Sequence, residues 1–283
     1  MASSSAAPLT FPEHCHEAIF KVLSAQRWSY KVSLPRKRNK QAALLNPAAL
    51  SASVDHAFAN DLAPVLPSPN SSMRAPVIVD IGSGLALYHV HIARWFGGRA
   101  THYLVDRSLN EIPARGFGST FGYHPAREGA GRFSFYNSLD CARDTLVANG
   151  ILRHRLHLVN ASSQAVAALG DASADIVMSL WSWGFHYPVE TYLEAASGIL
   201  RPAGLLILFV DIVPRRYLSQ LQVLRGAGFR CTNTSIDYRL GGTRNLALRL
   251  TCQRACARNA AAASSTCERT TRRWSWSVDD GHA

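Results

Sequence analysis

Apolar residues between positions 76 and 253 follow two alternating patterns. Segment 76–82 is a continuous apolar run, typical of a strand buried on both faces, and four further short segments are read as strands: 101–106, 155–161, 174–180 and 204–213. Four segments with helical spacing accompany them: 87–97, 136–150, 189–200 and 215–229. Strands that alternate with helices predict right-handed βαβ units and a parallel sheet covered on both faces.

The last two apolar segments break this alternation. Segments 230–238 and 245–252 both have strand character, and only a short turn with Gly241-Gly242 separates them. Such a hairpin pairs antiparallel, so one of its strands must run against the rest of the sheet. The sequence therefore predicts an α/β fold: a doubly wound, mostly parallel seven-stranded sheet that ends in an antiparallel hairpin.

The flanks of this region differ from it in composition. Residues 1–74 contain one helical pattern, at 16–28, followed by a stretch rich in Pro, Ser and Asn. The segment 254–283 is low in complexity and is expected to be disordered. We therefore divide the chain into an N-terminal helix with a flexible linker (1–74), a folded domain (75–253) and a tail (254–283).

Composition narrows the partners and the compartment. The net charge of +11 is concentrated at 35–40 and in the tail, which favours solvated basic flanks over a nucleic-acid surface. No apolar run is long enough for a transmembrane helix, and the N-terminus lacks the pattern of a secretory signal. Six widely spaced cysteines are expected to be free thiols in a reducing cytoplasm, and neither His14-Cys15-His16 nor the Cys252/Cys256/Cys267 set is expected to hold a metal.

Candidate chemistry begins where the first predicted strand ends, in Asp80-Ile81-Gly82-Ser83-Gly84-Leu85-Ala86. Glycines at a strand-to-helix turn let the backbone approach a ligand. A dinucleotide fingerprint needs a third glycine at position 87, where this chain has leucine. Asp80 suits the ammonium of an amino-acid-like ligand better than a pyrophosphate, whose charge it would repel. An ordinary glycine-rich turn is the alternative.

The second and third predicted strands also end in polar residues. Asp106 lies 22 residues after Gly84, where a carboxylate can accept both hydrogen bonds from a ribose diol. Asn160, or a neighbouring backbone group such as that of Ala161, is placed to bind an adenine amino group. Simple turn-forming roles remain the alternative for these residues.

These motifs resemble those of class I S-adenosylmethionine-dependent methyltransferases over nearly all of residues 76–253. "VDIGSGLA" is similar to their glycine-rich first motif, with Ala86 in place of the usual third glycine, and "YLVD" to their second motif. "ILRPAGLLIL" and "LRGAGF" are similar to the turns before their fifth and sixth strands. The resemblance implies S-adenosylmethionine as cofactor, bound by a set that we extend along the strand ends: Asp80, Gly82, Ser83, Gly84, Asp106, Asn160, Ala161 and Ser179.

A narrower resemblance concerns the acceptor. "GFGSTFGY", "FYNSLDCARDTLVANGI" and "SLWSWGFHYPVETYL" are together similar to bacterial-type sugar O-methyltransferases. This implies an enzyme that methylates a hydroxyl of a sugar or another small molecule. Two alternatives stay open: a methyltransferase that acts on protein or RNA, and a non-catalytic binding module with the same fold.

The stretch 178–188, "MSLWSWGFHYP", follows the fourth predicted strand and would face the transferred methyl group. It lacks the acid-or-Asn, two-proline, aromatic signature typical of enzymes that methylate amino groups of bases. We assign His186 as the general base for a hydroxyl, with a packed structural histidine as the alternative. Trp181, Trp183 and Tyr187 are assigned to the acceptor wall, with core filling as the alternative. Loop 115–131, with five glycines, is predicted to be a lid.

Overall fold

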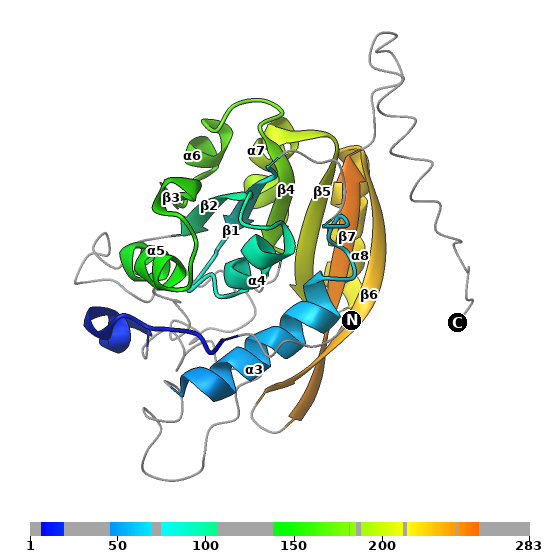
Figure 1. Ribbon diagram of the computed structural model, residues 1–283. Coiled ribbons are helices and arrows are strands. Elements are labelled where there is room, and N and C mark those ends of the chain that lie inside the picture. The colour runs from blue at the N-terminus through cyan, green and yellow to red at the C-terminus, as the bar shows by residue number, and fades with distance from the viewer. Residues whose placement is uncertain are drawn as a thin grey trace, which may run out of the picture.

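The computed structural model describes most of the domain and parts of the N-terminal flank. The described residues are 7–19, 46–69, 75–106, 138–180, 182–184, 188–211, 214–240 and 243–254. They form one mixed sheet with helices packed against both of its faces (Figure 1).

The sheet has seven strands in the order β3-β2-β1-β4-β5-β7-β6. Its members are β1 (Val77–Ile81), β2 (Thr101–Asp106), β3 (Leu156–Asn160), β4 (Ala174–Ser179), β5 (Leu200–Asp211), β6 (Phe229–Leu240) and β7 (Thr243–Arg254). Strands β1 to β5 pair in parallel, whereas β7 runs antiparallel to both β5 and β6. The predicted doubly wound sheet with its terminal hairpin is therefore confirmed.

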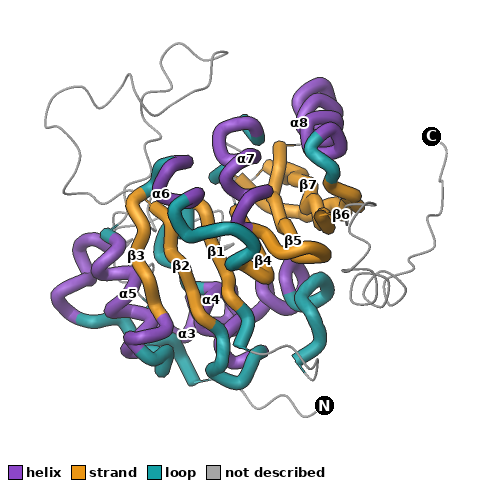
Figure 2. The backbone as a smooth tube through the Cα atoms, turned by 90° about the horizontal axis from the view of Figure 1, so that it is seen from above, coloured by secondary structure: helices purple, strands orange, loops and turns teal. Residues whose placement is uncertain are grey.

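Helices form two layers (Figure 2). One face of the sheet carries α3 (Pro47–Ala57), which continues as the π-helix η2 (Phe58–Leu62), together with α4 (Tyr88–Trp95) and α5 (Leu139–Ala148). The other face carries α6 (Ser163–Ala167), α7 (Glu190–Ile199) and α8 (Pro214–Gly226). Two short 3₁₀ turns complete the described elements, η1 (Glu13–Cys15) and η4 (Arg153–Arg155).

Helix α3 lies within the segment whose composition predicted a flexible linker. Asn46 caps the helix, since its side chain accepts from the backbone N–H groups of Ala48 and Ala49 at 3.1 and 3.2 Å, and Pro47 occupies the first turn. Buried residues of α3 recur at helical spacing: Leu50, Val54 and Ala57. The expected linker thus contains a packed helix. Of the helix predicted at 16–28, only residues 16–19 are described, and they are helical.

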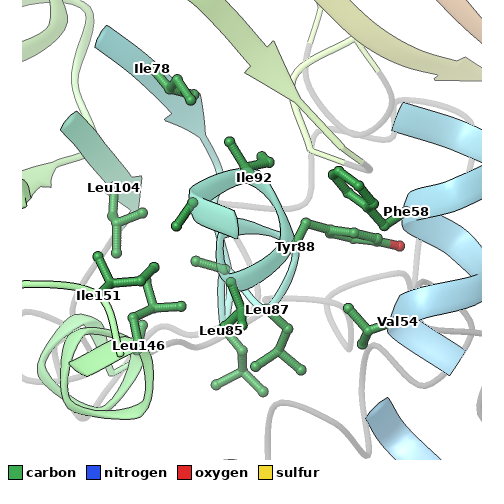
Figure 3. Close-up of a cluster of buried hydrophobic side chains, with 14 of the residues drawn as sticks. Val54, Phe58, Ile78, Leu85, Leu87, Tyr88, Ile92, Leu104, Leu146 and Ile151 are labelled. Atoms are coloured by element: carbon green, nitrogen blue, oxygen red, sulfur yellow. The ribbon is translucent and has the colours of Figure 1, made fainter. Parts of the chain in front are cut away.

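Helix α4 is the centre of the packing on the first face. Figure 3 shows Tyr88 of this helix directed toward Phe58 of η2, next to Val54 of α3. Leu146 of α5 lies on its other side, in the same buried cluster. Because α4 follows the glycine turn directly, packing of this helix fixes the turn against the end of β1.

Two disulfides contradict the expectation of free thiols. Cys15 bonds to Cys141 of α5 across 126 positions, and Cys231 bonds to Cys252, its register partner in the β6–β7 hairpin. Wide spacing along the sequence hid both pairs, because only the folded chain brings their Cα atoms to 5.4 and 4.0 Å. Cys256 and Cys267 lie outside the described residues. Within the described ranges, no helix is long and apolar enough to cross a membrane.

Candidate functional site

The glycine turn after β1 is held against the end of β2 by hydrogen bonds. The N–H of Gly82 donates to the carbonyl of Val105 at 2.7 Å, and the N–H of Gly84 donates to Oδ2 of Asp106, also at 2.7 Å. Both glycines have positive φ, 76° and 56°. Asp106 thus caps the turn, which was the alternative to its predicted role, and its predicted binding of a ribose diol remains a prediction.

Gly82 also has no room for a side chain. A Cβ built at this position would lie 2.1 Å from Oγ and 2.2 Å from Cβ of Ser182, in the segment after β4. The exit of β4 therefore rests directly on the turn. This places the predicted acceptor side and the predicted cofactor side of the sheet edge in contact.

Ala86, the departure from the glycine-rich motif, keeps the conformation of a glycine. Its φ is 53°, in the left-handed region, and its side chain is buried. For a residue with a Cβ this conformation costs about 1 kcal/mol. The surrounding fold thus imposes the glycine geometry on an alanine.

Asp80 lies at the end of β1 beneath this turn and is 4% exposed. Its Oδ2 is 3.0 Å from Nε2 of His89 on α4. Its Oδ1 is buried and has no hydrogen-bond partner in the described part of the chain, and the same holds for Oγ of Ser83. Burial raises the pKa of Asp80 to about 8 and lowers the pKa of His89 to about 3.

These unpartnered atoms test whether a cofactor fits the site. Buried polar groups are nearly always hydrogen-bonded, so two orphan oxygens at one glycine turn indicate a missing partner. An acceptor at Asp80 and a hydroxyl at Ser83 suit the ammonium and carboxylate of an amino-acid moiety. The residues present are therefore compatible with S-adenosylmethionine.

Sequence reasoning missed two residues of this region, His89 and His102. Nδ1 of His89 lies 2.8 Å from Nδ1 of His102 on β2, and both side chains are fully buried. The available signal was a histidine at the second position of an apolar strand, paired in register with Ile78 of β1. Periodicity alone does not reveal the contact, because it depends on how α4 packs on β2.

The end of β3 lies beside Asp106. Asn160 is the register partner of Asp106, and the N–H of Ala161 donates to the backbone carbonyl of Asp106 at 3.0 Å. Asn160 is exposed, so its amide is accessible from this edge of the sheet. An adenine-binding role for Asn160 and Ala161 remains a prediction.

Ser179 at the end of β4 is buried and bonded within the protein. Its Oγ donates to the carbonyl of Ile81 at 2.6 Å and accepts from the N–H of Trp183 at 2.8 Å. With no exposed surface, this hydroxyl ties the exits of β1 and β4 together. The expectation that it faces the cofactor is not met in this conformation.

Trp183 belongs to the core rather than to the acceptor wall. The residue is 0% exposed, its Nε1 donates to the carbonyl of Val189 at 2.7 Å, and its ring meets Tyr192 edge-on. Alternation along an extended segment shows which residues share a side, but not which of the two sides faces the core. In the structure, the side of Trp183 faces the core. The other residues assigned to this region lie outside the described ones: Trp181, His186, Tyr187 and loop 115–131.

One group of side chains in the described segments has metal-ligating chemistry. His14, Cys15 and Cys141 place their ligand atoms within 4.8 Å of one another. The two sulfurs are bonded to each other, and Nε2 of His14 lies 3.2 Å from Oδ2 of Asp144. The cluster is therefore a disulfide beside a histidine that is hydrogen-bonded to Asp144.

No protein-family profile and no curated protein sequence matches the chain. Similar solved structures include a precorrin-6Y C5,15-methyltransferase from Geobacter metallireducens, with 12% identity and a TM-score of 0.45 over 79% of this chain and 94% of that one. An arsenic(III) S-adenosylmethionine methyltransferase from Chlamydomonas reinhardtii has 12% identity and a TM-score of 0.45, over 73% and 74%. A predicted O-methyltransferase from Agrobacterium tumefaciens has 18% identity and a TM-score of 0.43, over 66% and 78%. At these values none of them identifies the family or the substrate of this chain.

Proposed function

We propose that this protein is an S-adenosylmethionine-dependent methyltransferase that methylates a hydroxyl of a sugar or another small molecule. The observation that carries the proposal is the pair of acids at adjacent strand ends: Asp80 with its unpartnered Oδ1, and Asp106 joined to the turn at Gly84. Both face the carboxyl edge of the parallel strands, where ligands of doubly wound sheets bind. The motif resemblance and the seven-stranded sheet with its antiparallel β7 support the same function.

In this proposal each end of the cofactor meets one acid. Asp80 accepts from the ammonium of the methionine moiety, and Asp106 accepts from the ribose hydroxyls while it orients the amide of Gly84. Asn160 and Ala161 lie at the next strand end, where we propose that the exposed amide of Asn160 binds the adenine. Bound S-adenosylmethionine supplies a methyl group on a sulfonium, and the protein must position a nucleophile in line with it and exclude water.

The acceptor hydroxyl also needs a base. His186 follows the buried segment that contains Trp183, three positions after a residue that is anchored to β1 through Ser179. We propose that His186 takes the hydroxyl proton, since an imidazole accepts protons near neutral pH. Replacing His186 by Ala or Gln is expected to lower kcat about 10²- to 10⁴-fold with little change in cofactor affinity. Near wild-type kcat in both variants would exclude this role.

Calorimetric titration with S-adenosylmethionine tests the cofactor site directly. Asp80→Asn and Asp106→Asn should each weaken binding at least tenfold, because each removes a charged hydrogen-bond acceptor. Asp171→Asn, at an exposed acid away from the strand ends, is the matched control and should bind normally. Absence of binding to the wild-type protein would contradict the proposal and favour a module without this cofactor.

A labelled-methyl screen over glycosides, phenols and RNA then identifies the acceptor class. Transfer to glycosides or phenols supports the proposal. Transfer to RNA alone, with strongly salt-dependent binding, would instead assign the enzyme to nucleic acid and give the +11 net charge a direct role.

A further inference from the structure

A chain of three buried polar side chains runs beneath the glycine turn, and we call it the Asp80–His89–His102 chain. Oδ2 of Asp80 is 3.0 Å from Nε2 of His89, and Nδ1 of His89 is 2.8 Å from Nδ1 of His102. The three residues come from β1, α4 and β2, and none is more than 4% exposed. Asp80 lies at the carboxyl end of β1, whereas His102 lies near the start of β2, so the chain leads from the candidate cofactor site toward the opposite edge of the sheet.

The two histidine contacts restrict where protons can lie. Two facing Nδ1 atoms at 2.8 Å require that one donates and the other accepts, and each neutral imidazole has one donor and one acceptor. If Asp80 is ionised and both imidazoles stay neutral, His89 must donate from Nε2, and His102 must then donate from Nδ1. If Asp80 is protonated and donates to His89, the latter donates from Nδ1 and His102 carries its proton on Nε2. The charge of Asp80 therefore determines both tautomers.

Burial determines which arrangement the free protein adopts. It raises the pKa of Asp80 to about 8, lowers that of His89 to about 3 and lowers that of His102 well below its usual value. The pKa of His102 is further lowered by its neighbours His89 and Arg155. His91, two residues after His89, instead pairs with Asp55 at 3.1 Å and takes no part. These directions favour a free protein in which Asp80 holds the proton and both histidines are neutral near neutral pH.

We propose that His89 and His102 are positioning residues of the cofactor site, which hold the Asp80 carboxyl group under the glycine turn and switch tautomer together when a cationic ligand binds there. This inference rests on the proposed function. A ligand ammonium at Oδ1 stabilises the carboxylate, so Asp80 gives its proton to Nε2 of His89. Nδ1 of His89 passes its own proton to Nδ1 of His102, and the proton on Nε2 of His102 is lost. The balance is one proton released to solvent for each cation bound.

The arrangement gives His89 on α4 and His102 on β2 a reason to be buried between apolar side chains. A carboxylate buried without a partner is strongly disfavoured, and His89 provides the donor that keeps Asp80 in place in its ionised form. His102 completes the hydrogen bonding of His89 in either proton arrangement. The site can therefore accept a cation at Asp80 without leaving the inner end of the acid unpaired.

Nitrogen-15 NMR of labelled histidines tests the switch in the ligand-free protein. Between pH 6.5 and 9.5 we expect His89 to change from the Nδ1–H to the Nε2–H form and His102 to change from Nε2–H to Nδ1–H, with one shared midpoint near pH 8. Histidines that keep their tautomers, or change at separate midpoints, would overturn the proposal. This measurement requires no ligand and so is independent of the proposed function.

Titration with S-adenosylmethionine at pH 7, in buffers of different ionisation enthalpy, tests the link to binding. We expect close to one proton released per cofactor bound, the same change of tautomers, and loss of the release at pH 9.5, where Asp80 is already ionised. Binding without proton release would overturn this inference and leave the proposed function intact. Absence of binding, with the pH-driven switch present, would overturn the proposed function alone.

Variants separate positioning from a general structural role. His89→Gln should weaken S-adenosylmethionine binding at least tenfold and abolish the proton release. His91→Gln, on the same helix and also buried, should leave both unchanged. Wild-type affinity and proton release in His89→Gln would overturn the proposal. If that variant fails to fold, the wild-type NMR measurement decides.

Discussion

The two faces of the sheet are built from the same strands but differ in what they bury. In β1, Asp80 points toward α4, whereas its neighbours Val79 and Ile81 belong to the cluster on the other face. The α4 face contains Asp80, His89 and His102, while the opposite face is filled by aliphatic residues around Trp183. A single strand can therefore supply an apolar core on one face and buried polar groups on the other.

The difference follows from the partners available on each face. A buried polar group is disfavoured unless it is hydrogen-bonded, and the α4 face offers such partners from helix and strand alike. Arg249 of β7, on this same face, donates to the backbone carbonyl of Asp61 in η2. On the other face, Ser179 is buried only at the strand exit, where it bonds to two backbone groups. The stability of the protein should therefore depend on pH mainly through the groups on the α4 face.

Each face also contains one disulfide, and the two disulfides close loops of different length. Removal of the longer loop's disulfide is expected to cause the largest loss of stability. Cys15–Cys141 closes 126 positions and Cys231–Cys252 closes 21. Loop-closure entropy predicts losses of about 5 and about 3 kcal/mol when each pair is replaced by alanines. Urea unfolding of the two double variants measures this difference. Wild-type protein treated with a reductant serves as the reference, and a larger loss from the hairpin pair would contradict the expectation.

Truncation of Trp183 tests the apolar face. Trp183→Ala should lower the free energy of unfolding by about 4 kcal/mol, because it opens a cavity and leaves the carbonyl of Val189 unpaired. Trp183→Phe, which keeps most of the volume, should lose about half as much or less. Leu152→Ala, at an exposed position, is the control. A small loss in Trp183→Ala would mean that this side chain does not anchor the core.

The pH dependence of stability tests the α4 face and is the smallest expected effect. Folded Asp80 keeps its proton up to about pH 8, whereas the unfolded chain loses it near 3.8, so this group lowers stability as pH rises between those values. Folded His89 stays neutral down to about pH 3, and its contribution opposes that of Asp80 below 6.5. Between pH 6.5 and 8, where Asp80 acts alone, stability should fall by about 2 kcal/mol.

Urea unfolding at pH 6.5 and 8.5 measures this fall, and Asp80→Asn should remove it. An equal fall in the variant would assign the pH dependence to other groups. The apolar face has no buried titratable side chain among the described residues, so its variants should retain the wild-type pH profile.

The elements of the sheet could be predicted because burial on both faces leaves a direct signal in the sequence. All seven strands lie where the apolar segments indicated them, although β5 begins at Leu200, four positions before the predicted start. Helix α3 was missed because a composition rich in Ala and Ser resembles a linker, while its spacing of Leu50 and Val54 shows a buried helical stripe.

The candidate site likewise contains residues that could be predicted from the sequence and residues that could not. Asp80, the glycine turn and Asp106 lie close together in sequence and at fixed places on the strands, so their proximity follows from topology alone. His89 and His102 were missed because their interaction depends on how α4 packs over β2, which no local pattern specifies. Which side Trp183 faces is likewise decided by packing and not by alternation.

Because Gly82 and Ser182 are in contact, these two positions cannot be mutated independently, although they are far apart in the sequence. A side chain at position 82 would occupy the space of Ser182, and a bulkier residue at 182 would press on the backbone of the turn. Mutagenesis libraries aimed at the acceptor side therefore need to vary position 182 within small residues only, or together with the length of the segment that follows β4.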